Sequence, residues 1–430
     1  MKAFRWAVSV YRRFLSQWWL FRVLKEIALW VYRFCYRCIS YVSAIPQSGV
    51  YVWRVLCASG IGIADRVSTL DHGGSIFVSQ PRFWGFGAAA AVRDTPARRL
   101  NLPTIAVLQI PHVVVVGGID YVFRGREAYH SQYFRPGEQK CPAENVGVIA
   151  QDAFGKNCAL HLTKKGTRIS TGVMLIGQSS RNYAHWLTEV LPKLAVLEAS
   201  MEEQSAPLLV DSGLHENLLA SIDIVNRCQR PVVIVDRWTA VEVDRLTVVT
   251  QPGYERYIPY RISTRPPPPY SNEFSRFALR LMRDAVWGAI GEHYREGPKH
   301  LYLGRNEKSA NMRCVANWGS VRTVIEKRRI GHYMVDSMTF GEQVAAVHAA
   351  ELIVAPVGAA LANMIFAPEG CRVVALAPYY EGASYSYFTN LAGVLGHDLR
   401  FVLGQPVGRR GHPMQRNYWI EEKDVVEALS

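Results

Sequence analysis

The chain has 430 residues, of which 49% are hydrophobic and 20% are charged. This composition excludes an intrinsically disordered protein, and the length exceeds one ordinary core, so we expect two domains with an appendage. The net charge is +13, and residues 1–45 carry +7 of it, from eight basic residues against one acidic residue. The mild basic excess elsewhere suits a polyanionic ligand. We expect no nucleic acid as a partner, because no recognition motif or aromatic-basic platform is present.

The eight cysteines are scattered, and only Cys35 and Cys38 are close in sequence. That pair has no second pair to complete a zinc or redox site. We therefore expect reduced thiols and a cytoplasmic protein.

Residues 1–60 are predicted to form a basic amphipathic helical region. Basic residues recur through its apolar part and no small-residue cleavage site follows, which argues against a signal peptide. Apolar residues repeat at helical spacing at Leu20, Leu24, Ile27, Ala28, Val31 and Phe34. Two interpretations remain open: residues 1–45 lie on an anionic membrane surface, or they pack against the body of the protein.

Residues 61–264 are predicted to form the first α/β domain. Residues 60–150 are β-rich, with the clearest strand at 112–118. Strands at 173–177, 207–211 and 232–236 then alternate with helices near 182–200 and 214–226. The four prolines of residues 265–270 end this pattern, since they can continue neither a helix nor a central strand, and they predict a stiff linker.

Residues 271–405 are predicted to form the second α/β domain, followed by a tail at 406–430. The expected helices cover about 271–294, 318–328 and 340–350, and the expected strands cover 300–305, 333–336, 352–355 and 372–378. Alternation of this kind predicts parallel sheets covered on both faces, with ligands beyond the carboxyl ends of the strands.

The uncharged run from Leu352 to Pro368 is too short and too interrupted to span a membrane, which takes about 20 apolar residues. It predicts a strand, a turn of small residues at Gly358 and Ala359, and a short helix. The N-terminus of such a helix suits a phosphate. Tight packing of helix on sheet is the alternative interpretation.

The stretch of residues 179–194 follows a strand and opens a helix, with Asn182 as its predicted cap. His185 and Glu189 share one helix face, so the carboxylate can orient the imidazole as a general base. Tyr183 and Trp186 offer flat faces for an acceptor sugar. The alternative is a buried helix in which His185 and Glu189 pair only with each other or with the backbone.

Further candidates lie in the second domain. Arg305 at a strand end and Arg313 in the next loop are candidates for binding a diphosphate, unless that loop is simply solvated. Glu342 is a candidate for ribose hydroxyls, and Asn363 for a ligand or for its own turn. A serine-hydrolase interpretation of residues 177–182 fails, because Arg181 stands where the nucleophile elbow needs glycine.

Four motifs resemble one family in order and spacing: NYAHWLTEVLPKL, YLGRNE, FGEQ and VGAALANMIFAPEG. Together they resemble the glycosyltransferase 61 family over roughly residues 170–380, a family associated with bacterial capsular polysaccharide biosynthesis. The resemblance implies a GT-B-like fold of two Rossmann-like domains facing a cleft. It also implies inverting transfer from a nucleotide sugar without an obligatory metal, in agreement with the absence of an Asp-x-Asp motif.

The resemblance also implies roles for single residues. It implies that the acceptor-side domain contributes the site residues Asn182, His185, Trp186 and Glu189. It implies that the donor-side domain contributes Arg305, Glu342, Gly358, Ala359 and Asn363. The chain departs from the family pattern at four positions. Val357 replaces His, Ala360 replaces Gly, Cys314 follows Arg313 in place of a second Arg, and Trp318 replaces an acidic residue.

We therefore expect a hexosyl- or pentosyltransferase that moves a sugar from a nucleotide-sugar donor to a glycan or lipid-linked acceptor. His185 is the expected base, with Glu189 assisting it. The expected location is the cytoplasm, at the inner face of the membrane through residues 1–45. The alternative is a catalytically weakened glycan- or nucleotide-binding protein, since Val357 removes an imidazole from the presumed phosphate site.

Overall fold

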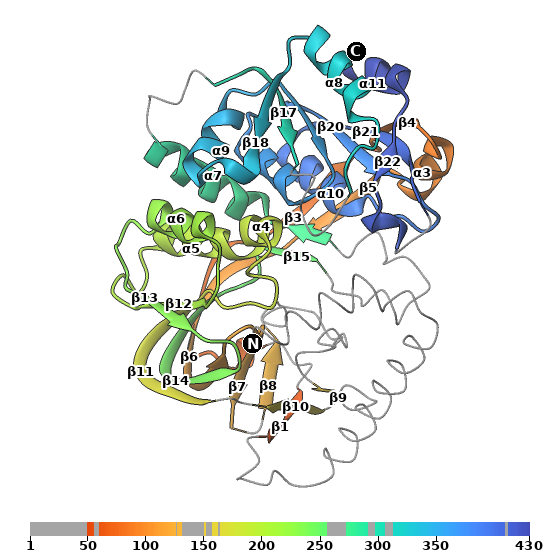
Figure 1. Ribbon diagram of the computed structural model, residues 1–430. Helices are drawn as coiled ribbons and strands as arrows, with labels where there is room; N and C mark the ends of the chain where they lie inside the picture. The colour runs from red at the N-terminus through yellow and green to blue at the C-terminus, as the bar shows by residue number, and fades with distance from the viewer. Residues whose placement is uncertain are drawn as a thin grey trace.

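The computed structural model describes residues 50–55, 60–125, 127–130, 150–151, 157–161, 164–255, 272–290, 297–305, 313–408 and 412–430. The predicted helix within residues 1–45 and the linker at 265–270 lie outside these residues. Residues 50–55, which we assigned to the helical region, form a strand instead. Figure 1 shows two α/β units, one above the other, and the C-terminus lies on the upper one.

The lower unit is built on a mixed sheet of 11 strands in the order β13-β12-β11-β14-β6-β7-β8-β1-β10-β9, with β2 paired to β6. Its strands are β1 (Val50–Val55), β2 (Arg66–Asp71), β6 (Ile105–Val116), β7 (Tyr121–Arg124), β8 (Glu127–His130), β9 (Ala150–Gln151), β10 (Asn157–His161), β11 (Lys164–Met174), β12 (Leu208–Asp211), β13 (Val232–Val235) and β14 (Thr239–Val249). The turn η2 (Gly60–Ile63) precedes β2.

Only part of this sheet meets the Rossmann-like expectation. The strands β13, β12, β11 and β14 run parallel, whereas β14 pairs antiparallel with β6, and β6 with β7. The antiparallel part arises because β6, β7 and β8 are joined by short turns, and parallel neighbours would need long crossovers. The helices after β11 and β12 are α4 (Tyr183–His185), the π-helical turn η4 (Trp186–Val190), α5 (Leu191–Ser200) and α6 (Glu216–Val225).

The upper unit is built on a second sheet in the order β18-β17-β19-β20-β21, extended by β4 and β22. Its strands are β17 (His300–Gly304), β18 (Gly331–Met334), β19 (Leu352–Pro356), β20 (Arg372–Pro378), β21 (Asp398–Pro406), β22 (Tyr418–Trp419) and β4 (Arg82–Gly85). All pairs except β21–β22 are parallel. In this doubly wound order β18 is added on one side of β17 and β19 on the other, so the strand order reverses between β17 and β19, which is the topological switch point.

The connecting elements of the upper unit cover both faces of its sheet. They are α7 (Arg276–Ile290), α8 (Trp318–Lys327), η6 (Val335–Ser337), α9 (Phe340–His348), the 3₁₀-helix η7 (Ala359–Phe366), α10 (Ser386–Leu395), η8 (Pro413–Gln415) and α11 (Glu422–Leu429). The strands expected at 300–305, 352–355 and 372–378 and the helix expected at 340–350 are thereby confirmed within one or two residues.

Segments from both ends of the chain complete the upper unit. Strand β4 pairs with β21, next to α3 (Ala88–Asp94). The antiparallel pair of β3 (Gly74–Val78) and β5 (Arg98–Leu102) packs against α10. Helix α11, from the predicted tail, buries Val425 and Ala428 against α8 and the sheet. The boundary at 265–270 stays a prediction, but residues of the first quarter of the chain belong physically to the upper sheet.

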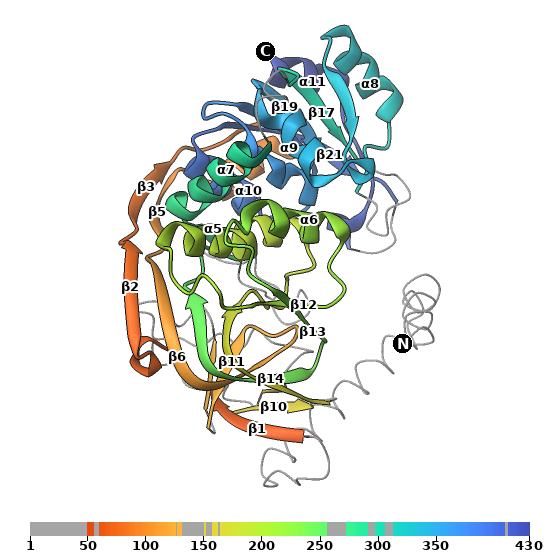
Figure 2. The ribbon, with the colours of Figure 1, turned by 90° about the vertical axis from the view of Figure 1, so that its left-hand side faces the viewer.

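The two sheets share one hydrophobic core. Leu175, Leu194 and Val210 of the lower unit belong to the same buried cluster as Ile353 and Phe366 of the upper unit. In Figure 2 the helices α5 and α6 lie between the lower sheet and α7, and α5 and α6 both contact α7. The expected arrangement of two domains facing a cleft is not tested, and within the described residues the two units are joined by packed helices.

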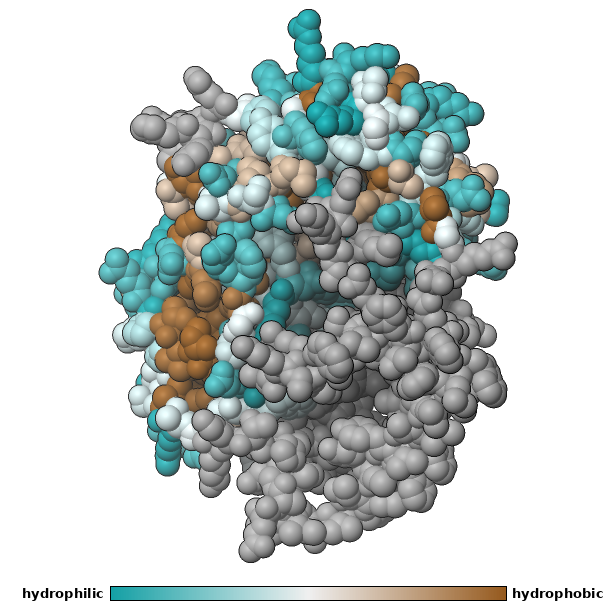
Figure 3. Space-filling model, viewed as in Figure 1, coloured by the Kyte–Doolittle hydropathy of each residue, from teal (hydrophilic) through white to brown (hydrophobic). Residues whose placement is uncertain are grey.

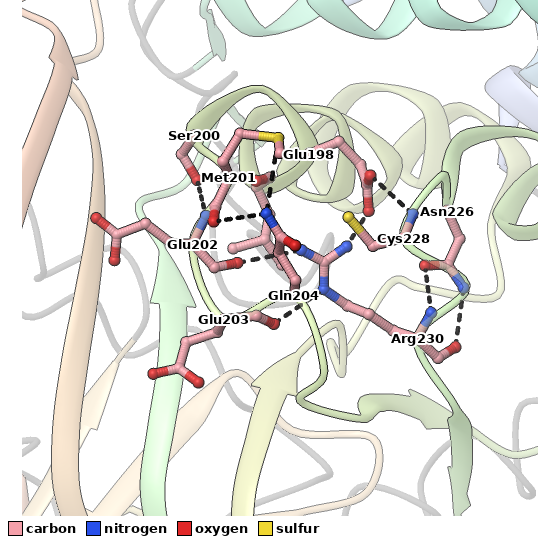
Figure 4. Close-up of polar contacts among 10 residues, drawn as sticks. Glu198, Ser200, Met201, Glu202, Glu203, Gln204, Asn226, Cys228 and Arg230 are labelled. Atoms are coloured by element: carbon pink, nitrogen blue, oxygen red, sulfur yellow. Dashed lines mark hydrogen bonds and ion pairs between the residues drawn. The ribbon is translucent and has the colours of Figure 1, made fainter.

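The C-terminal end of α5 is held by a buried guanidinium. Arg230 pairs with Glu198 and donates to the carbonyl oxygens of Glu202 (3.1 Å) and Glu203 (3.2 Å), as Figure 4 shows. Asn226 accepts from the Arg230 N–H and donates to its carbonyl oxygen. A buried pair of this kind is costly to break, because one charge then stays uncompensated. These contacts of Arg230, which precedes β13, hold the C-terminal end of α5 in place relative to β13.

The surface has two features of note. Val232 and Ile234 of the edge strand β13 are exposed, and Figure 3 shows apolar side chains gathered at that end of the lower sheet. Among the described helices, none is long and apolar enough to cross a membrane.

Candidate active site

Arg305 and Gly358 lie together at the switch point of the upper sheet. Arg305 directly follows β17, and Gly358 follows β19, its parallel neighbour. A Cβ atom added to Gly358 would lie 2.6 Å from Nη1 of Arg305. The φ of Gly358 is 173°, which is extended backbone, so glycine is needed here for space. The guanidinium therefore rests against the small-residue turn.

Arg313 is brought to the same end of the sheet. Burial raises the pKa of Tyr418, and the charges of Arg305 and Arg313 both act on this hydroxyl in the opposite direction. The Tyr418 hydroxyl donates to the carbonyl oxygen of Leu376 (2.7 Å) on β20. Two arginines thus surround the carboxyl ends of the central strands, as an anion site requires.

The turn after β19 continues as the 3₁₀-helix η7, where a short helix was expected. Ala359 and Ala360 occupy its first turn, and both are partly buried. The first N–H groups of a helix have no acceptor within the helix. Their direction adds positive potential beside Arg305.

Glu342 and Asn363 have partners within the protein. The exposed Glu342 carboxylate accepts from the Thr339 N–H (2.7 Å) and hydroxyl (2.9 Å), and Thr339 in turn caps the Glu342 N–H in a capping box. Asn363 is fully buried and donates to Gln343 Oε1 (3.1 Å). In this structure Glu342 stabilises the N-terminus of helix α9. Its binding of ribose hydroxyls stays a prediction.

Asn363 also joins the two units. The Tyr183 hydroxyl, at the start of α4, donates to Asn363 Oδ1 at 2.7 Å. Asn182 caps this helix, as predicted, by accepting from the Ala184 N–H (3.0 Å), and its side chain is otherwise exposed. The two motifs that sequence places 180 residues apart, around Tyr183 and Asn363, therefore lie side by side.

The π-helical turn between α4 and α5 shapes the next part of the site. Pro192 has no N–H to donate to the carbonyl oxygen of Thr188, four residues earlier. The Leu191 N–H donates to the carbonyl oxygen of Trp186, five residues earlier, which makes this turn π-helical. A Cβ atom on Gly253 would lie 2.2 Å from the Thr188 carbonyl oxygen. The missing side chain lets β15 (Gly253–Glu255) run directly against the π turn.

Trp186 does not face the site. Its side chain is fully buried, and its indole N–H donates to Ser221 Oγ at 2.8 Å. The sequence-based role as a stacking surface for an acceptor needs an exposed ring face. We therefore give this residue a core-packing role in the structure.

His185 lies between two carboxylates. Its Nδ1 is 2.7 Å from Glu189 Oε1, and its Nε2 is 3.3 Å from Glu255 Oε2. The ring of Tyr387, from α10 of the upper unit, lies 6.1 Å from the imidazole between centroids. The pairing of His185 with Glu189 across one helical turn was predicted. The approach of Glu255 and Tyr387 was not.

The carboxylates control the charge of the imidazole. Burial lowers the pKa of His185, but the negative charges of Glu189, Glu255 and Asp120 outweigh it and raise the pKa to about 9. At neutral pH the ring is therefore an imidazolium. Burial raises the pKa of Glu255, His185 lowers it, and Glu189 raises it.

Asp120 is a site residue that sequence reasoning missed. Burial raises its pKa to about 6, against the opposing effects of Lys193 and of the Gln178 N–H, which donates at 3.0 Å. It stands after the strand at 112–118 and a Gly-Gly turn, but such turns are common. Glu255 was missed as well, because it reaches His185 only through the packing of β15, which pairs with β16 (Asn272–Phe274), against the π turn.

Asp211 and Asp236 also stand at strand ends, where a carboxylate could serve as a base in place of His185, and the structure places them differently. The Asp211 carboxylate is buried and accepts from the Gly177 N–H (2.9 Å), the Ser180 hydroxyl (2.6 Å) and the Gly118 N–H (2.5 Å). It ties together the turns that follow β11 and β6. Asp236 is exposed.

Within the part of the chain that the structure describes, no group of three or more His, Cys, Asp or Glu side chains has the arrangement of a metal site. The expectation that no metal is obligatory stays a prediction. The chemical groups available are the arginine-lined turn on the upper sheet and the His–Glu–Glu cluster on the lower one.

Comparison with known proteins identifies one family. Residues 183–374 match the family model described as Glycosyltransferase 61. The match begins at Tyr183, next to His185, and extends over the switch point. No curated protein matches the chain. The sequence-based resemblance to the glycosyltransferase 61 family, a family of sugar transferases, is thereby confirmed over residues 183–374.

Proposed function

We propose that the protein transfers a hexosyl or pentosyl unit from a nucleotide-sugar donor to a glycan or lipid-linked acceptor, with inversion, in polysaccharide biosynthesis. One observation carries the proposal. The 3₁₀-helix η7, whose first residues lie beside Arg305 and Gly358, is joined to the helix bearing His185 by the Tyr183–Asn363 hydrogen bond of 2.7 Å. An anion site and an acid–base cluster thus adjoin, as a transfer that releases a nucleoside diphosphate requires.

On the donor side, the diphosphate lies against Arg305, Arg313 and the first N–H groups of η7. When the bond between the anomeric carbon and the phosphate oxygen breaks, its electron pair stays on the nucleoside diphosphate. Fixed positive groups stabilise that charge more in the transition state than in the ground state, which lowers the barrier. Val357, in place of a family His, contributes no charge here.

On the acceptor side, an acceptor hydroxyl loses its proton to the cluster around His185 and Glu189 and attacks the anomeric carbon from the opposite face. Positioned acid–base groups contribute on the order of 10²–10⁴ in rate. Tyr387 from the upper unit closes this cluster on one side. Residues 1–45, with their basic excess, bring the enzyme to lipid-linked acceptors at the inner membrane face.

A thermal-shift panel of nucleoside diphosphates and nucleotide sugars tests the proposal. A ligand at 100 times its Kd should stabilise the folded state by about 2.7 kcal/mol. Arg305→Ala should weaken that binding at least tenfold, since a hydrogen bond to a charged group contributes about 1.5–3 kcal/mol. Arg322→Ala, a surface change on α8, is the matched control. Binding without sugar transfer would favour the alternative, a nucleotide-binding protein, and absence of both would refute the proposal.

A further inference from the structure

Glu255 occupies an unusual place between the two units. It ends β15, whose backbone pairs antiparallel with β16, with Glu255 opposite Asn272. Strand β16 contacts α10 and β5 of the upper unit, and β15 contacts the π turn of the lower unit. The Glu255 N–H donates to Glu189 Oε1 (3.3 Å). The residue is therefore held from both sides, next to His185.

The ring nitrogens of His185 limit what this residue does. Each nitrogen faces a carboxylate oxygen, at 2.7 Å for Glu189 and 3.3 Å for Glu255. A neutral imidazole has one N–H, so one nitrogen would then turn its lone pair toward a carboxylate oxygen. Two N–H groups satisfy both partners. In this arrangement His185 has no lone pair with which to accept a proton.

Among the three groups, Glu255 is the most exposed to solvent. Its side chain is 40% exposed, against 18% for His185 and 11% for Glu189. Its Oε2 faces His185, and its Oε1 has no hydrogen-bond or ion-pair partner among the described residues. The partly exposed carboxylate is therefore open to an acceptor hydroxyl, and water can later remove the proton from it.

We propose that Glu255 is the catalytic base of the sugar transfer and that His185 and Glu189 are positioning residues. This rests on the proposed function. The acceptor O–H bond breaks and its proton goes to the Glu255 carboxylate, while the oxygen forms the new bond to the anomeric carbon. The anomeric C–O bond to the phosphate breaks, and its electron pair leaves with the nucleoside diphosphate. The protonated Glu255 then returns its proton to solvent.

The groups around Glu255 agree with its role as the base and with the positioning roles of His185 and Glu189. Among the residues that the structure describes, the charged and titratable groups around Glu255 are His185, Glu189, Asp120, Lys193 and the buried hydroxyl of Tyr387. Burial and Glu189 raise the pKa of the Glu255 carboxyl, which strengthens it as a base, and the His185 imidazolium limits that rise. Removal of the imidazolium should therefore raise the pKa of Glu255 further.

The main test is transfer by Glu255→Gln, with Glu273→Gln from the partner strand as the matched control. At saturating nucleotide sugar and acceptor, Glu255→Gln should lower kcat at least 100-fold, within the range expected for a general base. Donor binding, measured by thermal shift, should stay within twofold, and Glu273→Gln should keep its kcat. Should Glu255→Gln lose its fold, Glu255→Asp replaces it. This variant keeps a carboxylate and should retain a measurable fraction of kcat with the acidic limb of its pH profile.

The second test distinguishes His185 as a positioning residue from His185 as the base. His185→Gln should move the acidic limb of the kcat/KM profile to higher pH, because the positive partner of Glu255 is lost. If His185 were the base, that limb would disappear. A wild-type level of kcat in Glu255→Gln would overturn the inference and leave the proposed function standing. A wild-type enzyme that transfers no sugar would overturn the proposed function itself.

Discussion

Glycine is needed at position 358 because of the neighbouring Arg305 side chain and not because of the backbone dihedral. Its φ of 173° is open to any residue, but an added Cβ would lie 2.6 Å from Nη1 of Arg305. The atom met is the far end of a flexible side chain, so the guanidinium can move away. Space at Gly358 thus controls where Arg305 points, and through it the proposed diphosphate site.

Gly358→Ala should therefore separate binding from stability. We expect the free energy of unfolding to change by less than about 1 kcal/mol, while the affinity for the nucleotide falls about tenfold through the displaced Arg305. The measurement is titration calorimetry with the nucleotide identified by the thermal-shift panel. Gly341→Ala is the control, since a Cβ there meets nothing within 4 Å. Equal affinities for both variants would speak against the contact.

Single residues also limited what sequence could predict. Asn182 as a helix cap and His185 paired with Glu189 follow from local spacing, and both are present. Glu255 follows from no local pattern, because its partner His185 lies 70 residues earlier and meets it only where β15 packs against the π turn. For Trp186 the sequence suggested a site residue where there is none, because an aromatic ring beside a polar motif can equally well point into the core, as this one does.

At the scale of elements, the helix expected over 182–200 is present but is not one regular helix. Pro192 interrupts its hydrogen-bond ladder and produces the π turn Trp186–Val190. The periodicity of apolar residues predicts that a helix exists, but it does not report a local change of hydrogen-bond register. That change is what brings Thr188 against Gly253 and β15 against His185.

The chain of side chains Tyr183–Asn363–Gln343 couples the elements α4, η7 and α9. Asn363→Ala would leave the Tyr183 hydroxyl and Gln343 Oε1 without the partner they have now. We expect a loss of about 2–4 kcal/mol, since each unsatisfied buried group costs about 1–3 kcal/mol. Thermal unfolding should show a lower Tm for Asn363→Ala than for Tyr183→Phe, which leaves the Gln343 bond intact. A wild-type Tm for Asn363→Ala would exclude this coupling.

At the scale of the whole molecule, the shared core determines how the protein unfolds. Residues of both units belong to one buried cluster, and α5 and α6 pack on α7 between the sheets. Separate domains with separate cores would unfold independently. Loss of either unit would therefore expose the apolar faces that α5, α6 and α7 bury between the sheets.

We therefore expect one cooperative transition in scanning calorimetry. Leu191→Ala on α5 removes a fully buried side chain of the shared cluster. It should lower the free energy of unfolding by about 2–5 kcal/mol and shift the whole transition to a lower temperature. Val402→Ala, in the separate cluster on the far face of the upper sheet, is the comparison variant. If Leu191→Ala shifts only one of two resolved transitions, the units are energetically independent and the shared core does not couple them.

Sequence by itself determined the alternation of strands and helices from residue 173 onward, the small-residue turn after β19 and the family, because these depend on local periodicity and on motif order. Only the tertiary structure decided that β4 joins the upper sheet, that the lower sheet is mixed, and that Glu255 faces His185. These features depend on contacts between residues far apart in the chain. Such contacts leave no local signal, since the same strand or carboxylate fits many partners until the whole core is packed.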